Sequence, residues 1–308
     1  MRWKRGPGGR GGTGVIEDVL EALRCPHCGQ EFAVAMAPDD VGRALMCAGG
    51  HSFDVARQGY VSLLPGDAHT GTADTTAMVA AREAFLARGH FDPIAERVAS
   101  AAMRAADGLE GVVIEVGAGT GYYLAHALNA LDALDGFGPH AGLALDISKH
   151  AARRAARAHP RIGVLVCDVW RELPVAPASA AVVLDVFAPR NAAEMARVLV
   201  AGGALVVVTP TPRHLSQLVA GGGMLTVDER KAERLETSVG GWFELAGEES
   251  CEYTVAMSDE DVAAAEAMGP GAYHARPDAD PTASGQRDVT VSVRIGTYRV
   301  RLRPQVNA

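Results

Sequence analysis

The sequence lacks the features that would direct a protein across or into a membrane. None of its apolar runs reaches the roughly 20 residues that a membrane-spanning helix needs. The basic start, Met1 to Arg5, is not followed by the apolar core of a secretory signal. The 5 cysteines show no disulfide pattern, because three of them lie close together near the N-terminus. We therefore expect a cytoplasmic protein without a membrane partner.

Aromatic residues and excess positive charge are also scarce. Aromatics make up 5% of the chain while Ala, Gly, Val and Arg are abundant, a composition typical of a high-GC genome. The formal net charge is −8, which does not favour nucleic-acid binding, although a local basic patch would suffice for it. A basic arm covers residues 1–14. A second basic series, spaced by four along a predicted helix, is either a binding patch or an ordinary solvated face: Lys149, Arg153, Arg157 and Arg161.

The cysteines that are present form the most specific motif of the chain. Cys25 and Cys28 form a Cys-x2-Cys pair, and Cys47 and His51 form a Cys-x3-His pair. Zinc binds four such ligands tetrahedrally, and a site with four protein ligands leaves no position for a reacting water. The spacing predicts a structural zinc ion held by these four residues. The alternative is four unrelated thiols and imidazoles.

After residue 110, short apolar runs alternate with helical patterns. The predicted strands cover residues 112–116, 143–146, 162–167, 180–186, 204–209, 252–257 and 289–301. Strands that are apolar on both faces and separated by helices indicate a parallel sheet covered by helices on both sides. We expect an α/β fold with a doubly wound, seven-stranded sheet, preceded by two helices over residues 76–88 and 93–106.

A glycine-rich turn follows the first of these strands. It reads Glu115-Val-Gly117-Ala-Gly119-Thr-Gly121, and Asp146 ends the next strand, where it is placed to accept both hydroxyls of a ribose. The Gly-x-Gly-x-x-Gly spacing that seats a pyrophosphate is missing, and the acidic Glu115 favours a cationic ligand. This combination resembles the S-adenosylmethionine site of class I methyltransferases.

That resemblance implies further cofactor contacts. Asp168, directly after the third strand, would bind the adenine amino group, and Val169 would line the base. Asp146 as a helix cap and Asp168 as the cap of a turn remain the alternatives. The whole predicted cofactor set is Arg82, His90, Glu115, Gly117, Ala118, Gly119, Thr120, Gly121, Tyr122, Asp146, Asp168 and Val169.

Several longer phrases narrow the resemblance to one family. They cover residues 53–65, 81–91, 117–123, 145–149, 187–189 and 211–215. Their order and wording, over about residues 24 to 277, resemble the 23S rRNA guanine-N1 methyltransferases of the RlmA and TlrB type. The resemblance implies a class I, Rossmann-like methyltransferase domain with a small N-terminal zinc-binding domain. The implied division is a disordered basic arm, a zinc-binding RNA-recognition domain, a linker with helices capping the cofactor, and the catalytic domain: residues 1–14, 15–65, 66–110 and 111–308.

The family also implies a substrate, namely a guanine in the hairpin of 23S rRNA at the peptide exit tunnel. Composition favours the TlrB type, which methylates guanine 748 and confers resistance to tylosin-like macrolides. The RlmA type, which methylates guanine 745, is the alternative, and a homodimer is implied for both. A methyltransferase acting on a small metabolite and a non-catalytic RNA-binding protein also remain open.

Methylation at guanine N1 requires that a proton be removed or that the resulting anion be stabilised. Amino-group methyltransferases commonly carry an Asn/Asp-Pro-Pro-aromatic sequence after the fourth strand, and this chain has Asp185-Val-Phe187-Ala-Pro189 there. We expect Asp185 to act as the base, with a strand-end cap as its alternative. Phe187 is expected to stack on the extruded guanine.

Overall fold

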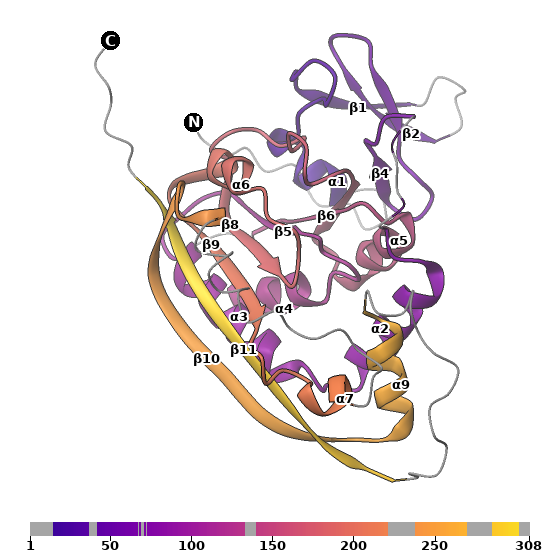
Figure 1. The fold of residues 1–308 in the computed structure, drawn as a ribbon. Helices are drawn as coiled ribbons and strands as arrows, with labels where there is room; N and C mark the ends of the chain where they lie inside the picture. Colours follow the sequence, from indigo (N-terminus) through magenta and orange to yellow (C-terminus); the bar gives the residue numbers. More distant parts are fainter. Residues whose placement is uncertain are drawn as a thin grey trace.

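The computed structural model contains a small sheet and a large sheet, packed against each other (Figure 1). The predicted N-terminal arm lies outside the residues that the structure describes. The described residues are 15–36, 42–66, 68, 71, 73–132, 140–220, 238–269 and 285–301.

The small sheet carries the zinc motif. Its strands β1 (Phe32–Met36), β2 (Arg43–Cys47) and β3 (Ser52–Asp54) pair antiparallel in this order. A short helix α1 (Val15–Asp18) and a 3-10 turn (Leu20–Ala22) precede it, whereas the helical pattern of residues 15–23 predicts one continuous helix.

The large sheet contains all seven predicted strands and one more. Its order is β10-β11-β9-β8-β5-β6-β7-β4, and the pairs from β9 through β4 are parallel. β11 runs antiparallel between β9 and β10. The bounds are β4 (Tyr60–Ser62), β5 (Val112–Val116), β6 (Gly142–Asp146), β7 (Ile162–Val166), β8 (Ala180–Val186), β9 (Leu199–Pro210), β10 (Phe243–Met257) and β11 (Arg287–Val300).

The additional strand, β4, joins the N-terminal segment to the large sheet. Tyr60 pairs with Val164 of β7, and the backbone N–H of Leu63 donates to the carbonyl of Val166 at 2.8 Å. The segment that follows the zinc ligands therefore shares a hydrogen-bonded ladder with the predicted catalytic sheet.

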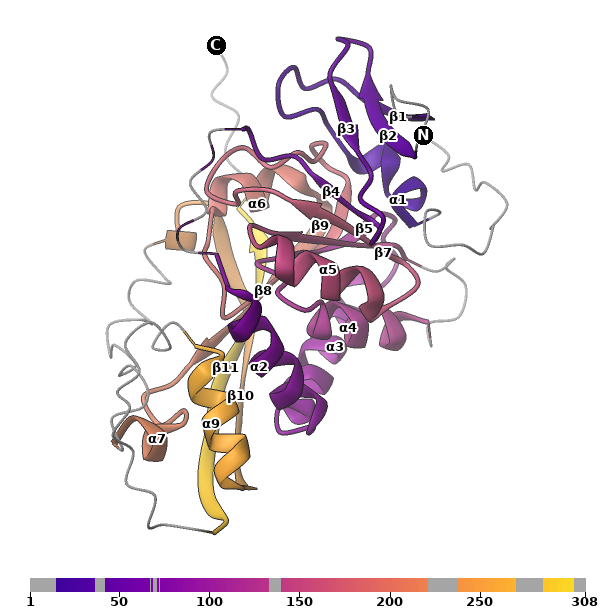
Figure 2. The same ribbon diagram turned by 90° about the vertical axis from the view of Figure 1, so that its right-hand side faces the viewer.

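Helices cover both faces of the large sheet, as predicted. On one face lie α2 (Thr76–Ala87), α3 (Asp92–Ala106), α4 (Tyr122–Leu131) and α5 (Lys149–Ala158), and on the other lies α6 (Ala192–Val198). α3 has Pro93 in its first turn, which suits a residue without an N–H to donate. Two later helices, α7 (Ser216–Ala220) and α9 (Asp259–Ala267), adjoin the long strands β10 and β11, and α9 lies beside α2 (Figure 2).

The core on the α6 side of the sheet continues into the zinc-binding part. Phe32 and Leu45 of the small sheet are buried in the same apolar cluster as Ile114 and Leu143 of the large sheet. The two sheets therefore stabilise each other by shared apolar burial. Within the described residues, no helix is both long and apolar enough to cross a membrane.

Candidate functional site

The four predicted zinc ligands converge at one end of the small sheet. Their ligand atoms all lie within 4.8 Å of one another. Cys28 Sγ is 3.6 Å from Cys47 Sγ, and His51 Nδ1 is 3.6 Å from Cys25 Sγ and 3.4 Å from Cys47 Sγ. A tetrahedral zinc with bonds of about 2.0–2.3 Å has ligand-to-ligand distances of roughly 3.4–3.8 Å. The donor set and its spacing therefore fit a zinc ion.

Two tight turns hold these ligands in place. The N–H of Gly29 donates to the carbonyl of Cys25 at 2.8 Å, and the N–H of Gly50 donates to the carbonyl of Cys47 at 3.0 Å. Both glycines have a positive φ, 69° and 83°, which a residue with a side chain rarely adopts. The sequence therefore forms a metal-binding turn at each pair of ligands.

The pKa values of two cysteines in this cluster are shifted in opposite directions. Burial raises the pKa of Cys25 to about 11, although the N–H groups of His27 and Cys28 oppose it. The pKa of Cys47 is lowered to about 6, because hydrogen bonds from the N–H and ring of His51 and from the other thiols outweigh its desolvation. Zinc binds the thiolate form, so metal binding would release the proton of each thiol that is still protonated.

The glycine loop occupies the end of β5 at which the parallel strands finish. Gly117, Gly119 and Gly121 all have positive φ, between 53° and 78°. A Cβ on Gly117 would lie 2.7 Å from that of Ala188, so this loop and the segment after β8 touch. A Cβ on Gly121 would lie 3.1 Å from the Cα of Ala155 in α5. The glycines thus permit a close approach that no other residue allows.

Asp146 connects this loop to α5. Its carboxylate accepts hydrogen bonds from the N–H of Gly119 at 2.8 Å and from that of Ser148 at 2.7 Å. Burial raises its pKa, although the two N–H donors oppose the shift. Ser148 itself caps α5 through its hydroxyl, so capping does not require Asp146. Each carboxylate oxygen can accept a second hydrogen bond, and the predicted ribose contact remains sterically reasonable.

The side chain of Glu115 is buried and contacts the start of α4. Its Oε2 accepts the N–H of Leu124 in the first turn of α4 at 3.1 Å, and the side chain is fully buried. Burial raises its pKa to about 8, with Asp146 and Asp185 contributing in the same direction. A nearby cation would favour its charged form.

Arg82 approaches the glycine loop at Gly119. Its guanidinium is 3.2 Å from where a Cβ of Gly119 would stand, and it donates to Asp74 and, at 2.9 Å, to the carbonyl of Met268. The predicted cofactor residue Tyr122 donates its hydroxyl to Asp92 and so ties α4 to α3. Of the other loop residues in the predicted set, Thr120 is half-buried and Ala118 is buried.

His90 lies further away, between α2, α9 and β10. Its Nε2 is 3.2 Å from Oδ1 of Asp261, and its carbonyl accepts the hydroxyl of Tyr253 at 2.7 Å. Burial of Asp261 is outweighed by hydrogen bonds from Ser258 and His90, which lower the pKa of Asp261 to about 2. These contacts indicate that His90 joins helices, and its predicted contact with a cofactor stays a prediction.

Asp168 begins a turn at the end of β7. Its Oδ1 accepts the N–H of Trp170 at 3.0 Å, and its Oδ2 is 3.6 Å from Nε of Arg171. These bonds match the capping alternative and leave acceptor positions for an adenine amino group. Val169 is buried beside it.

Asp185 is completely buried near the end of β8. Its Oδ2 lies 3.4 Å from Nε of Arg190, whose side chain is only 14% exposed. A guanidinium so close offsets part of the cost of burying the carboxylate. The ion pair holds the segment that follows β8, and the role of Asp185 as a base stays a prediction.

Phe187 is the aromatic residue that faces the outside of this segment. It has a φ of 56°, a strained value that is typical of functional sites. Its ring is 38% exposed and lies within 5.7–6.4 Å, between ring centroids, of three aromatic rings: Phe91, Tyr123 and His214. The rings form an aromatic cluster next to the glycine loop.

Residues 23–70 match the zinc-ribbon family described as RlmA, N-terminal. The chain is 47% identical over 301 residues, 92% of its length and 98% of the relative's, to a protein of Micromonospora griseorubida provisionally named a 23S rRNA (guanine-N1)-methyltransferase. It is 45% identical over 263 residues to the 23S rRNA (guanine(748)-N1)-methyltransferase of Streptomyces fradiae, covering 85% of this chain and 89% of that one. The chain belongs to the 23S rRNA (guanine-N1)-methyltransferase family.

A more distant relative in Bacillus subtilis, provisionally given the same activity, is 32% identical over 200 residues, which are 64% of this chain and 67% of that protein. Membership confirms that the chain is a methyltransferase with an α/β, class I fold and an N-terminal zinc ribbon. The predicted resemblance is therefore correct.

Sequence patterns missed several residues of this methyltransferase site. Arg190 lies outside the phrases that carry the family resemblance, and Phe91 and Tyr123 end two of them without a predicted role. Their contacts with Asp185 and Phe187 arise only when separate elements pack together. The basic series was only partly correct. Lys149, Arg153 and Arg157 are exposed along α5, whereas the side chain of Arg161 is largely buried and 2.6 Å from Asp132.

Proposed function

We propose that this methyltransferase transfers a methyl group from S-adenosylmethionine to N1 of guanine 748 in the exit-tunnel hairpin of 23S rRNA. The product would protect the ribosome from tylosin-like macrolides. The observation that carries the proposal is the 45% identity, over most of both chains, to the Streptomyces fradiae enzyme with this target. The zinc ribbon and the glycine loop support it, since both parts of such an enzyme are present.

Bound S-adenosylmethionine would supply an electrophilic methyl group on a sulfonium. We assign its contacts to the predicted set from Arg82 to Val169. Gly117 and Gly119 would admit it against bare backbone, Asp146 would bind the ribose, and Asp168 with Val169 would receive the adenine. Glu115 would balance the positive ligand from below. The zinc ion would be structural, held by Cys25, Cys28, Cys47 and His51.

The target guanine is proposed to stack on Phe187. This ring adjoins the glycine loop through Ala188, and stacking on an aromatic side chain is how extruded bases are commonly held. His214 stacks beside it, with 5.7 Å between ring centroids. The N–H of Ser292 donates to Nδ1 of His214 at 3.2 Å, which assigns the proton of the neutral ring to Nε2.

Asp185, the predicted base, stays the candidate for assisting the loss of the N1 proton, despite its pairing with Arg190. His214 packs against Phe187, and we assign it the role of positioning the ring on which the guanine stacks. His214→Ala should therefore raise KM for RNA more than it lowers kcat. A loss in kcat/KM that is carried mainly by kcat would instead assign His214 to the chemical step.

A primer-extension experiment tests the function. Protein, cofactor and unmethylated 23S rRNA are incubated, and reverse transcription is expected to stop at guanine 748, because a methyl group on N1 blocks base pairing. A stop at guanine 745 would support the RlmA-type alternative. A protein that binds the cofactor and produces no stop in the hairpin would contradict the proposal and favour a small-metabolite substrate.

The remaining features are proposed on the same basis. The division into an arm, a zinc-binding domain, capping helices and a catalytic domain, at residues 1–14, 15–65, 66–110 and 111–308, follows the family, with β4 as a link between the second and the fourth. A homodimer and a cytoplasmic location are expected from the resemblance and from the ribosomal substrate.

A further inference from the structure

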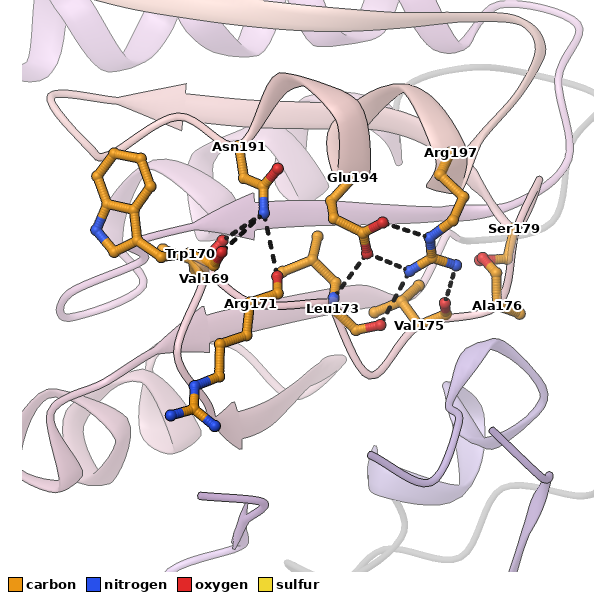
Figure 3. Close-up of polar contacts among 10 residues, drawn as sticks. All are labelled: Val169, Trp170, Arg171, Leu173, Val175, Ala176, Ser179, Asn191, Glu194 and Arg197. Carbon is orange, nitrogen blue, oxygen red and sulfur yellow. Dashed lines mark hydrogen bonds and ion pairs between the residues drawn. The ribbon is translucent and has the colours of Figure 1, made fainter. Parts of the chain in front are cut away.

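The loop after β7 presents a large apolar side chain to solvent. Trp170 is 66% exposed, and its neighbour Arg171 has a side chain that is 65% exposed. Figure 3 shows both side chains extending from the loop, away from the ion pair of Glu194 and Arg197. Exposure of a tryptophan on a loop is unfavourable in water unless a partner covers the ring.

Side-chain hydrogen bonds fix the backbone that carries Trp170. The side-chain amide of Asn191 lies within hydrogen-bonding distance of three successive carbonyls, those of Val169, Trp170 and Arg171, at 3.1–3.3 Å (Figure 3). Asp168 accepts the N–H of Trp170 from the other side. The indole therefore stands on a preorganised turn, and little ordering entropy would be lost when it binds a ligand.

The same loop is anchored further along by α6. Glu194 accepts the N–H of Leu173 at 2.7 Å, while Arg197 donates to the carbonyls of Leu173 and Val175 at 3.0 and 2.8 Å. Glu194 and Arg197 also pair with each other, and the pKa of Glu194 is lowered because these bonds outweigh its burial. The loop is thus held along its whole length.

The two ends of this loop lie at the two parts of the molecule that the RNA must reach. Asp168 belongs to the predicted cofactor site. Pro174 accepts the N–H of Arg24 at 3.0 Å, and Arg24 directly precedes the zinc ligand Cys25. An RNA that contacts the zinc ribbon while its guanine enters the catalytic edge would pass across residues 169–173.

We propose that Trp170 is a stacking site for an unpaired base of the substrate RNA, outside the methylated guanine, with Arg171 contacting the adjacent phosphate. This inference rests on the proposed RNA substrate. Every base offers a face that can stack on an indole, and a guanidinium beside it matches the phosphate that accompanies each base. The site would hold the hairpin in register between the zinc ribbon and the cofactor.

The experiment measures binding of a synthetic RNA hairpin with the sequence around guanine 748. Trp170→Ala should weaken binding roughly 5- to 150-fold, the range for loss of one base stack, while Trp170→Phe should keep most of the affinity. Affinity for S-adenosylmethionine, measured by calorimetry, should be unchanged in both. Leu245→Ala, at an exposed apolar residue of β10, is the matched control and should bind RNA like the wild type.

A second readout uses the fluorescence of Trp170 itself. The chain has 3 tryptophans, so Trp3→Phe with Trp242→Phe leaves Trp170 as the only one. Titration with the hairpin should quench its emission, and S-adenosylmethionine alone should not.

Three outcomes would overturn the inference. If Trp170→Ala binds RNA within twofold of the wild type, Trp170 is not a stacking site. A parallel loss of cofactor affinity would mean that the indole covers the adenine, and a change in oligomeric state would mean that a second copy covers it. If the wild type binds the hairpin through Trp170 yet leaves guanine N1 unmethylated, the proposed function fails while this inference stands.

Discussion

The ion pair with Arg190 determines which role the Asp185 side chain can have. The pair is buried, with 3.4 Å between Nε and Oδ2, and lies next to the segment that carries Phe187. Each charge offsets the desolvation of the other, so the loss of either partner leaves an uncompensated ion in a low-dielectric environment. The pair is thus suited to fixing Phe187 in its strained conformation.

Replacing the carboxylate separates this role from general-base catalysis. Asp185→Asn should lower the free energy of unfolding by about 3 kcal/mol, because Arg190 would stay buried without its counter-ion. Urea unfolding gives that value, and kcat of the folded variant should stay within roughly tenfold of wild type. An unchanged stability together with a loss in kcat of about a thousandfold or more would instead identify Asp185 as the base.

Glu115 gives the protein a pH-dependent stability. Its pKa in the folded protein is raised to about 8 by burial, from 4.5, so folding favours the protonated form. This contribution is fully present below pH 4.5 and is lost as the pH rises through about 8. Glu115→Gln, which still offers an oxygen to Leu124, should therefore become more stable relative to the wild type at higher pH.

Urea unfolding of both proteins at about pH 6 and pH 8.5 measures this difference, which should reach a few kcal/mol at most, at about 1.4 kcal/mol per pKa unit. The exposed carboxyl of Glu110 provides the control, since Glu110→Gln should show no such trend. A constant difference between Glu115→Gln and wild type at both pH values would contradict a raised pKa at this position.

At the scale of elements, the glycine loop fixes how closely α4 and α5 approach. Gly121 has a φ of 78°, and an added Cβ would lie 3.1–3.2 Å from atoms of Ala155 and Ala158. Gly108 has a similar φ of 73°, and nothing lies within 4 Å of its Cβ position. The two glycines therefore separate the cost of backbone strain from the cost of crowding.

Gly108→Ala should cost about 1–2 kcal/mol, the strain of a left-handed residue. Gly121→Ala should cost more than this and should weaken binding of S-adenosylmethionine, because α5 must move away from the loop. Thermal unfolding and calorimetry measure the two effects. Equal destabilisation by both substitutions, with cofactor affinity intact, would show that α5 moves away from the added Cβ without a cost in free energy.

The elements that sequence periodicity predicted best are those buried on both faces. β5 and β8 begin and end at the predicted residues, since a short and mostly apolar run that follows a glycine or a serine has few alternatives. β4 lies in the segment of residues 25–64, which the sequence predicts as short strands around the metal. Its pairing with β7 was not predicted, because three residues carry no periodicity that would assign them to a sheet. β10 is much longer than predicted, because its first half is exposed and rich in glutamate, which has a low strand propensity.

At the scale of the whole molecule, sequence analysis works best for local patterns. The four residues of the zinc motif converge as predicted, and the glycines form a loop after β5, while the contact of that loop with a cofactor stays a prediction. Contacts between distant residues could not be predicted. Arg82 reaches the carbonyl of Met268, and His214 accepts the N–H of Ser292, because packing brings together segments that carry no shared motif.

The zinc ribbon and the sheet domain share one apolar cluster, so loss of the metal should lower the stability of more than the ribbon. Cys28 is the exposed ligand, whereas Cys25 and Cys47 are buried in that cluster. Cys28→Ser therefore removes a ligand without emptying the core. The turn at Cys25 should loosen first, together with the strand β1 that follows it.

We expect purified wild type to contain about one zinc ion per chain, and Cys28→Ser to contain little, because three ligands bind zinc far more weakly than four. The variant should unfold at a lower temperature and bind the RNA hairpin at least about tenfold more weakly, since the ribbon would no longer present a fixed surface. Its affinity for S-adenosylmethionine should stay within about twofold, because the glycine loop and Asp146 belong to the parallel sheet. Met36→Ser, at an exposed residue of the same small sheet, controls for substitution there. Full zinc content in Cys28→Ser, or a collapse of cofactor binding, would contradict this division of roles.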